Sequence, residues 1–311
     1  MILSRDGIIG VAIGDAMGLP VQFNRREYFK THPVTEMLGH MVFDMPKGSW
    51  SDDTSMTLAT VDAIIKDKDV NIKTIADNFV KWLCENEYTP TGKAYDIGNT
   101  CMKAVMNYAK GKATAENCGL TGDMDNGNGS LMRILPIAYF CNAKKLSEEE
   151  IYNVVKSVSS ITHAHEVSVM GCFIYVLFAI ELLNDKSFNE AYEEIQKVDY
   201  ADYFSENAID RYKRVLNGKI QNEEEDDIST SGYVLHTLEA TFWVILNTSS
   251  YDEAILKTVN LGDDTDSVGA CVGGLAGIYY GLESINKDWR NSLIKFDEIE
   301  EMCKRFDEAL K

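Results

Sequence analysis

The stretch NLGDDTDSVGACVGGLAGIYYG (residues 260–281) combines two patterns that decide the fold, an acidic start and a glycine repeat. Glycine recurs at every fourth position there and near the N-terminus: at residues 269, 273, 277 and 281, and at residues 10, 14 and 18. Each glycine inside a helix costs about 1 kcal/mol relative to alanine. A row of glycines on one face therefore needs a compensating interaction, and close approach of a neighbouring helix provides one. We predict that both segments form central, closely packed helices of a bundle.

The remainder of the chain also favours helices. Apolar residues recur at helical spacing, SEEEIYNVVKSVSS (147–160) begins with a capping-box pattern, and no run of alternating strands is evident. Helices are expected at residues 74–86, 147–165, 170–185, 188–198, 237–248 and 251–262. With five prolines and no Pro/Ser/Gly-rich linker, residues 1–311 are predicted to form one compact all-α domain.

Composition narrows the possible partners. The chain carries 30 Lys and Arg against 49 Asp and Glu, a net charge of -19. Such a surface repels phosphate backbones and anionic lipid, so we expect neither nucleic acid nor a membrane as partner. The seven cysteines are scattered and form no CxxC pair, which is typical of reduced thiols in a cytoplasmic protein.

Two acidic clusters stand where helices are predicted to begin. GSWSDDTSMTLATVDAII (48–65) contains Asp52 and Asp53, and the opening stretch has aspartates at positions 263, 264 and 266. A single aspartate there is usually an N-cap, but five like charges exceed the free N–H groups of a first turn. The ligands are hard oxygens without adjoining Cys or His, which favours Mg²⁺, Mn²⁺ or Ca²⁺ over zinc. We predict a metal site where the clusters meet, with solvated helix caps as the alternative.

A glycine-rich segment, TGDMDNGNGSLMRILPIA (121–138), alternates Asn126 and Asn128 with Gly127 and Gly129. Glycine lets backbone N–H groups approach a ligand closely, so such a loop can cradle an anion. Gly/Asn clusters also form ordinary turns. Arg133, which follows, either holds the carboxylate of an acidic ligand or lies solvated at the surface.

Two histidines, His163 and His165, lie in SSITHAHEVSV (159–169). A partly buried histidine with satisfied hydrogen bonds is the commoner outcome. Beside a phosphate-bearing ligand, either histidine could instead donate a hydrogen bond to it.

Taken together, these blocks resemble the ADP-ribosylglycohydrolase family, of the dinitrogenase-reductase-activating glycohydrolase type. The matching segments, in order, are GVAIGDAMGLPVQF (10–23), GSWSDDTSMTLA (48–59), AYDIGNT (94–100), GNGSLMRILPIA (127–138), THAHEVSV (162–169) and VNLGDDTDSVGACVGGLAGIYYG (259–281). The resemblance implies a multi-helix orthogonal bundle with two Mg²⁺ or Mn²⁺ ions at the bottom of a cleft.

The resemblance also assigns roles to individual positions. The metal ligands would be Ser51, Asp52, Asp53, Asp264, Asp266 and Ser267. The residues around the diphosphate and ribose of ADP-ribose would be Asn126, Gly127, Asn128, Gly129 and His163.

The implied reaction is hydrolysis of an N- or O-glycosidic bond at C1″ of ADP-ribose, linked to a protein side chain, with arginine favoured, or to a small conjugate. A carboxylate would act as acid or base at the oxocarbenium-like centre. Gln22 stands where the family usually has a glutamate. Asp96 in AYDIGNT matches an aspartate credited with a catalytic role in arginine-type members, so the resemblance favours Asp96 as the catalytic base. Asp263 replaces a usual glycine and is expected to add negative charge beside the metals.

Two rival functions stay open at this point. Because Gln22 cannot transfer a proton, the chain could be a sensor that binds ADP-ribose or a nucleotide without hydrolysing it. An aspartate-rich enzyme acting on a diphosphate, like a terpene synthase, is the other. That chemistry requires a DDxxD motif with nearby basic residues, whereas Asp53 is followed by Thr-Ser-Met.

Overall fold

The computed structural model describes residues 3–311, and within that range it is all-helical. Two isolated bridges, Leu120 with His163 and Gly127 with Tyr233, are the only β-type pairings among these residues. The α-helices are α1 (Ser4–Gly18), α2 (Arg26–Phe29), α3 (Asp52–Asp67), α4 (Ile72–Glu85), α5 (Asn99–Ala109), α6 (Leu135–Lys144), α7 (Glu148–Ser159), α8 (Glu166–Leu183), α9 (Phe188–Ile195), α10 (Glu206–Arg211), α11 (Lys213–Leu216), α12 (Val234–Leu246), α13 (Tyr251–Asn260), α14 (Thr265–Tyr280), α15 (Lys287–Ser292) and α16 (Phe296–Ala309). Six short 3₁₀ segments connect them: η1 (Leu19–Val21), η2 (Asp123–Asp125), η3 (Tyr200–Asp202), η4 (Ile220–Asn222), η5 (Glu225–Asp227) and η6 (Leu282–Ser284). The predicted all-α fold is confirmed.

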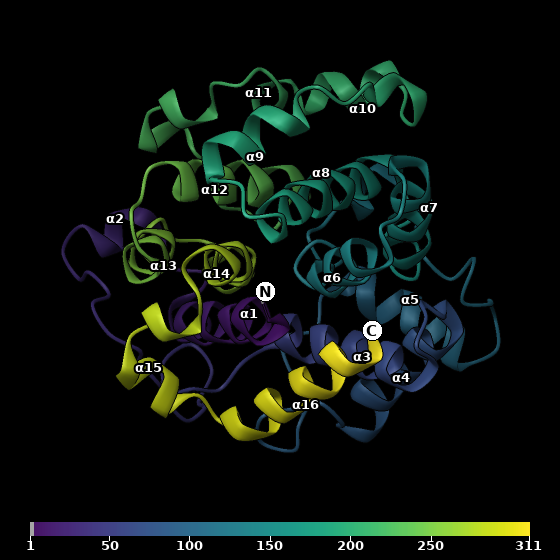
Figure 1. Cartoon of the computed structure of the whole chain (residues 1–311). Coiled ribbons are helices and arrows are strands. Elements are labelled where there is room, and N and C mark those ends of the chain that lie inside the picture. Colours follow the sequence, from purple (N-terminus) through teal and green to yellow (C-terminus); the bar gives the residue numbers. More distant parts are fainter. Residues whose placement is uncertain (1–2) are drawn as a thin grey trace.

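The two glycine-rich helices, α1 and α14, pack directly on each other at the centre of the molecule (Figure 1). A Cβ atom added to Gly14 would overlap the carbonyl oxygen of Gly269, and one added to Gly10 would overlap that of Gly273. Backbone therefore contacts backbone, which is the close approach that the spacing predicts. Gly281 is different: it ends α14 with a φ of 78° and meets no neighbouring atom.

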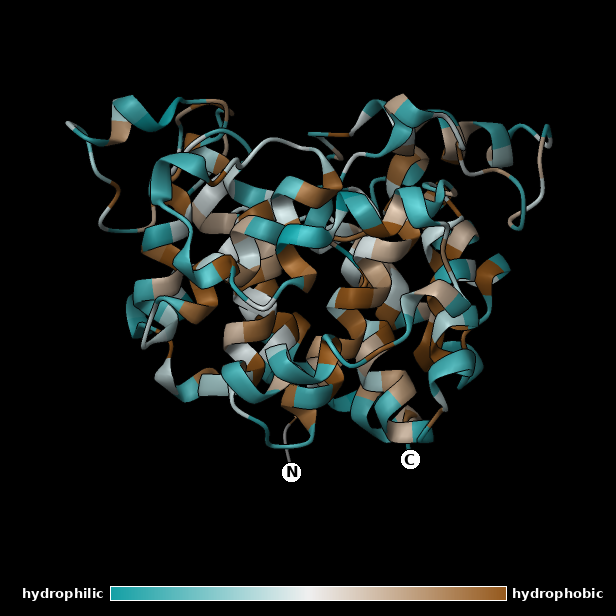
Figure 2. Cartoon of the chain, turned by 90° about the horizontal axis from the view of Figure 1, so that it is seen from above, coloured by the Kyte–Doolittle hydropathy of each residue, from teal (hydrophilic) through white to brown (hydrophobic). Residues whose placement is uncertain are grey.

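The other helices surround this pair. In Figure 1, α8, α9 and α12 lie on one side of it and α3, α4 and α16 on the other. Colouring by hydropathy shows apolar residues turned inward and polar residues outward (Figure 2). α8 is long and apolar enough to span a membrane by length and composition, but most of it is buried against α6, α7, α9, α12 and α14. The apolar side chains of α8 are therefore part of the protein core.

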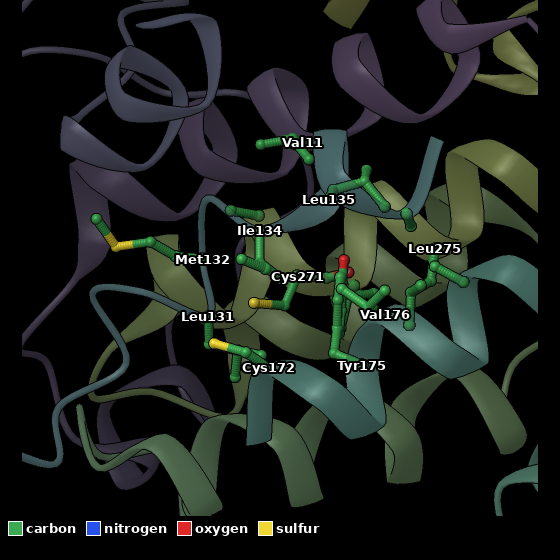
Figure 3. Packing of buried hydrophobic residues seen from close by; sticks show 14 of the residues in the cluster. Val11, Leu131, Met132, Ile134, Leu135, Cys172, Tyr175, Val176, Cys271 and Leu275 are labelled. Carbon is green, nitrogen blue, oxygen red and sulfur yellow. The ribbon is translucent and has the colours of Figure 1, made fainter. Parts of the chain in front are cut away.

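The segment between the glycine-rich loop and α6 is anchored in this core. Leu131, Ile134 and Leu135 pack among residues of α8 and α14 (Figure 3). The buried Tyr175 hydroxyl donates a hydrogen bond of 2.9 Å to the backbone oxygen of Cys271, which joins α8 to α14. The loop at residues 126–129 is therefore followed directly by residues that are packed in the protein core.

Candidate active site

The N-terminus of α3 is held by a carboxylate from another helix. Asp15, fully buried on α1, accepts hydrogen bonds from the backbone N–H groups of Ser51 at 2.9 Å and Thr54 at 3.0 Å. The Thr54 hydroxyl donates to the same carboxylate at 2.6 Å. Because these N–H groups belong to the first turn of α3, Asp15 takes over their capping and positions the acidic start of that helix.

The predicted acidic side chains do not cap the helices at which they stand. Ser51 is the N-cap of α3, and its hydroxyl oxygen accepts from the backbone N–H of Asp53 at 3.3 Å. Asp264 stands at the N-cap of α14, yet its side chain makes no cap hydrogen bond. The helix-cap interpretation therefore does not account for these carboxylates.

Three carboxylates meet at the bottom of the site. One oxygen each from Asp15, Asp53 and Asp266 lies within 4.8 Å of the others, and all three residues are buried. The Oδ1 atoms of Asp53 and Asp266 are buried without any hydrogen-bond partner among the described residues. Unpartnered buried oxygens are costly, and hard oxygen ligands suit a divalent cation. The residues present therefore fit a metal ion.

Electrostatics support the same conclusion. Burial, together with the charges of neighbouring aspartates, raises the pKa values of Asp52, Asp53 and Asp266 well above their usual range. Burial raises the pKa of Asp15 to about 7. Like charges this close resist simultaneous ionisation unless a cation neutralises them.

A cavity of about 290 Å³ adjoins the acidic cluster at Ser267, which lines the cavity and donates to Asp53 Oδ2 at 3.5 Å. Nine of the predicted site residues line it: Gln22, Asp52, Asp96, Gly127, Asn128, Gly129, His163, Asp264 and Ser267. Ser51, Asp53 and Asp266 lie outside that lining, in the buried layer with Asp15. The site thus has two sets of carboxylates. We call Asp52, Asp96 and Asp264, which line the cavity, its wall, and we call Asp15, Asp53 and Asp266, which are buried behind the lining, its floor.

The two asparagines of the glycine-rich loop act within the protein. Asn126 is buried, does not line the cavity, and accepts from the Ser168 hydroxyl at 2.8 Å while its amide donates to the backbone oxygen of Asp123 at 3.2 Å. Asn128 donates to Asp264 at 2.7 Å and to the Thr237 hydroxyl at 2.9 Å. Asn126 therefore shapes the loop, whereas Asn128 orients a wall carboxylate.

Gln22 and Asp96 are direct partners. The Gln22 amide donates to Asp96 Oδ2 at 2.6 Å, and both side chains line the cavity. Asp96 has a φ of 56°, in the left-handed region that aspartate adopts more readily than most non-glycine residues. The two candidate catalytic positions form one unit.

Neither sequence-based interpretation of Arg133 is correct. Its side chain is fully buried and donates to the backbone oxygens of Gly129 at 3.2 Å and Val158 at 3.3 Å, and to the Thr162 hydroxyl at 2.9 Å. The arginine lies beneath the loop, and it is neither at the surface nor in contact with the cavity.

Asp263 also differs from expectation. Its side chain is exposed and it does not line the cavity, and its backbone lies in the left-handed region with a φ of 58°. It therefore adds no charge to the floor of the site.

Sequence reasoning missed Asp15. Its signal was an acidic residue next to Gly14 in an otherwise apolar, glycine-rich helix. A charged residue that is buried must have a partner, so its place in the central helix could have marked it.

Comparison with known proteins identifies the class. Residues 4–311 match the ADP-ribosylglycohydrolase family. The chain belongs to that family, and it is a glycohydrolase. The predicted family and enzyme class are therefore confirmed.

Several relatives resemble nearly the whole chain. ADP-ribosylarginine hydrolase Tri1 of Serratia proteamaculans is 32% identical over 305 residues, covering 97% of this chain and 78% of the relative. The ADP-ribosyl-[dinitrogen reductase] glycohydrolase of Rhodospirillum rubrum is 27% identical, covering 92% of this chain and 88% of its own. A solved structure titled ADP-ribosylglycohydrolase-related protein complex superimposes with a TM-score of 0.80 at 25% identity, covering 99% of this chain and 98% of that one.

Proposed function

We propose that this glycohydrolase is metal-dependent and cleaves the bond between C1″ of ADP-ribose and a modified protein side chain, with an arginine linkage favoured. The observation that carries the proposal is the buried carboxylate set of Asp15, Asp53 and Asp266, with two oxygens that lack partners, directly below a cavity lined by the glycine loop.

The acidic floor would hold one or two Mg²⁺ or Mn²⁺ ions, with Asp52 and Asp264 as further ligands from the wall. When bound, such ions orient a water molecule and the ribose hydroxyls and lower the pKa of that water. Ser51 and Ser267 both donate to Asp53 Oδ2, at 2.8 and 3.5 Å, and so orient a floor carboxylate. These two serines fit a supporting role as well as direct ligation.

Asp96 is proposed as the general base or acid. It lines the cavity, and its Oδ1 atom makes no hydrogen bond to the described residues, so it can accept one from a water or a leaving group. The amide of Gln22 can only donate to or accept from its partners. Here Gln22 donates, and it thereby keeps Oδ2 occupied and Asp96 in place.

The glycine loop is proposed to hold the diphosphate. The backbone N–H groups of Gly127 and Gly129 make no hydrogen bond to the described residues, whereas the N–H of Asn128 is used by Gly232 at 3.0 Å. Free N–H groups without Cβ atoms around them allow an anion to approach closely. They supply attraction for phosphate in a site that also presents the carboxylates of Asp52, Asp96 and Asp264.

The arginine linkage is favoured on two grounds. Two relatives at 32% and 30% identity are named ADP-ribosylarginine hydrolases. In addition, Asp96 lines the cavity and is not among the proposed metal ligands, and a carboxylate attracts a guanidinium group at close range. A protein carrying ADP-ribosylated arginine is therefore the proposed partner.

The decisive experiment measures release of ADP-ribose from arginine-, serine- and threonine-linked model substrates with Mg²⁺, with Mn²⁺ and with EDTA. Asp53→Asn tests the floor, and Asp263→Asn is the matched control, since it removes one charge nearby from an exposed side chain. Release from the arginine conjugate that EDTA and Asp53→Asn abolish, and that Asp263→Asn leaves intact, supports the proposal. Release that survives both EDTA and Asp53→Asn overturns it.

One observation favours a second candidate, a sensor that binds ADP-ribose without hydrolysing it. Gln22 replaces a residue that could transfer a proton, and its amide is committed to Asp96. Calorimetric binding of ADP-ribose with no release from any of the three conjugates would support the sensor and exclude the hydrolase.

A further inference from the structure

The guanidinium of Arg133 is a buried cation without an acidic partner among the described residues. It lies 4.6 Å from the centre of the Phe79 ring, and its hydrogen bonds go to two backbone oxygens and to Thr162 Oγ1. Burying an unpaired charge is expensive. The position of the guanidinium is therefore set by these three hydrogen bonds and by the contact with Phe79.

Thr162 lies between Arg133 and His163 and forms a hydrogen bond with each of them. A guanidinium can only donate, so Thr162 Oγ1 accepts from Arg133 at 2.9 Å. The same oxygen lies 2.8 Å from Nδ1 of His163. If Nδ1 carried a proton, the Thr162 hydroxyl would accept from both sides and its own hydrogen would lack a good acceptor. The Cys101 sulfur, near this hydroxyl, accepts hydrogen bonds weakly.

The opposite arrangement gives both the oxygen and the hydrogen of the Thr162 hydroxyl a partner. With Nδ1 unprotonated, the Thr162 hydroxyl donates to it and still accepts from Arg133. Burial, aided by the charge of Arg133, lowers the pKa of His163 to about 3, so the ring is neutral and carries a single N–H. That N–H is then on Nε2.

Nε2 faces the glycine loop and the cavity. His163 lines the cavity, and a Cβ added to Gly127 would lie 3.6 Å from Nε2. A Cβ added to Gly129 would come within 2.8 Å of the ring carbon Cε1, so this part of the ring packs against the loop. Nε2 has no hydrogen-bond partner in residues 3–311.

We propose that Arg133, acting through Thr162, holds His163 in the Nε2–H tautomer, so that the ring donates a hydrogen bond into the cavity to an anionic oxygen of the ligand. Arg133 and Thr162 are positioning residues, and His163 contacts the ligand. The identity of that ligand as ADP-ribose rests on the proposed function; the tautomer does not.

Nitrogen NMR of ¹⁵N-histidine-labelled protein tests the tautomer directly. The chain has five histidines, and the signals that vanish in His163→Gln assign this ring. We expect an unprotonated Nδ1 and a protonated Nε2 at pH 7. Thr162→Val removes the hydroxyl and should shift the ring toward a mixture of tautomers, whereas Thr162→Ser keeps the hydroxyl and should keep the tautomer. A wild-type ring protonated on Nδ1, or a Thr162→Val ring identical to wild type, overturns the proposal.

Binding of ADP-ribose, measured by calorimetry with Mg²⁺, supplies the second readout. Losing one hydrogen bond from the oriented ring should weaken binding about tenfold in Thr162→Val, with Thr162→Ser close to wild type. Equal weakening in both variants would show that packing alone matters and would overturn the proposal. Failure of the proposed function is distinguishable: an Nε2–H tautomer in a protein that releases no ADP-ribose rejects hydrolysis and leaves this inference standing.

Discussion

The Thr54 hydroxyl donates to the Asp15 carboxylate at 2.6 Å, which joins the first turn of α3 to the central helix α1. Both residues are fully buried, and the same carboxylate also receives the backbone N–H of Thr54. The acidic start of α3 is therefore positioned by a residue that lies 39 positions earlier in the chain.

Removing this hydroxyl should cost stability. Thr54→Val is expected to lower the free energy of unfolding by about 2 kcal/mol, because a hydrogen bond to a buried carboxyl group is lost and that group is left with one partner fewer. Thr57→Val is the matched control, since the Thr57 hydroxyl donates only to the backbone oxygen of Asp53 in its own helix. Urea denaturation measures both variants, and equal losses would contradict the special role of the Asp15 contact.

Divalent cations should raise the melting temperature without any substrate. Binding at a hundred times the dissociation constant stabilises the folded state by about 2.7 kcal/mol, or about 5 °C for a chain of this size. Asp266→Asn should remove this increase because it alters a floor carboxylate. Asp263→Asn should retain it. A Mg²⁺ or Mn²⁺ effect that persists in Asp266→Asn would place the ion elsewhere.

The backbone contact between α1 and α14 should not tolerate a methyl group. Gly14→Ala places Cβ onto the carbonyl oxygen of Gly269, where neither backbone can move freely, so we expect a loss of about 3 kcal/mol or more. Gly98→Ala is the control, because no atom lies within 4 Å of the added Cβ and its φ is -60°. Thermal unfolding that ranks the two variants equally would show that the glycine spacing is not required.

Acid should destabilise the protein partly through His163. Its pKa in the folded state is about 3, below that of an unfolded histidine, so its contribution is present at neutral pH and is lost as pH falls below the unfolded value. Between pH 7 and pH 5 this loss amounts to about 2 kcal/mol. His163→Gln should show a correspondingly flatter pH dependence of unfolding, and His32→Gln, at an exposed position, should follow wild type. Parallel curves for His163→Gln and wild type would mean that His163 is not buried as a neutral ring.

Asp96 and Gln22 should differ in their effects on hydrolysis. Asp96→Asn should reduce kcat roughly 10²–10⁴-fold if it transfers the proton, with little change in ADP-ribose binding. Gln22→Ala removes only the hydrogen bond that holds Asp96 and should cost about tenfold. Single-turnover kinetics measure the rate of hydrolysis in both variants. A larger loss of rate in Gln22→Ala than in Asp96→Asn would show that Gln22, and not Asp96, is the more important residue for hydrolysis.

Much of the fold was readable from local patterns. The glycine spacing in α1 and α14, the capping box at Ser147 and the apolar periodicity of α4 all depend on neighbours within one helix. The two acidic helix starts were readable for the same reason, because hydroxyl and carboxyl groups at a first turn follow from the chemistry of helix ends.

Residue type alone did not determine where each side chain points. Asn126 and Arg133 carry groups suited to a ligand, yet both form hydrogen bonds within the protein. Asn126 accepts from Ser168 on α8, and Arg133 donates to the backbone oxygen of Val158 on α7. Asp15 was overlooked because its partners on α3 are distant in sequence.

The sequence by itself therefore determined the all-helical class, the central glycine pair and the supply of hard oxygen ligands, all of which follow from short-range periodicity and chemistry. Only the tertiary structure decided which carboxylates form the floor of the site, which line its wall, and that Asp263 faces outward. The physical reason is that burial and charge repulsion depend on which helix ends meet, and that meeting is set by the backbone contact between α1 and α14 together with the hydrogen bonds from α3 to Asp15.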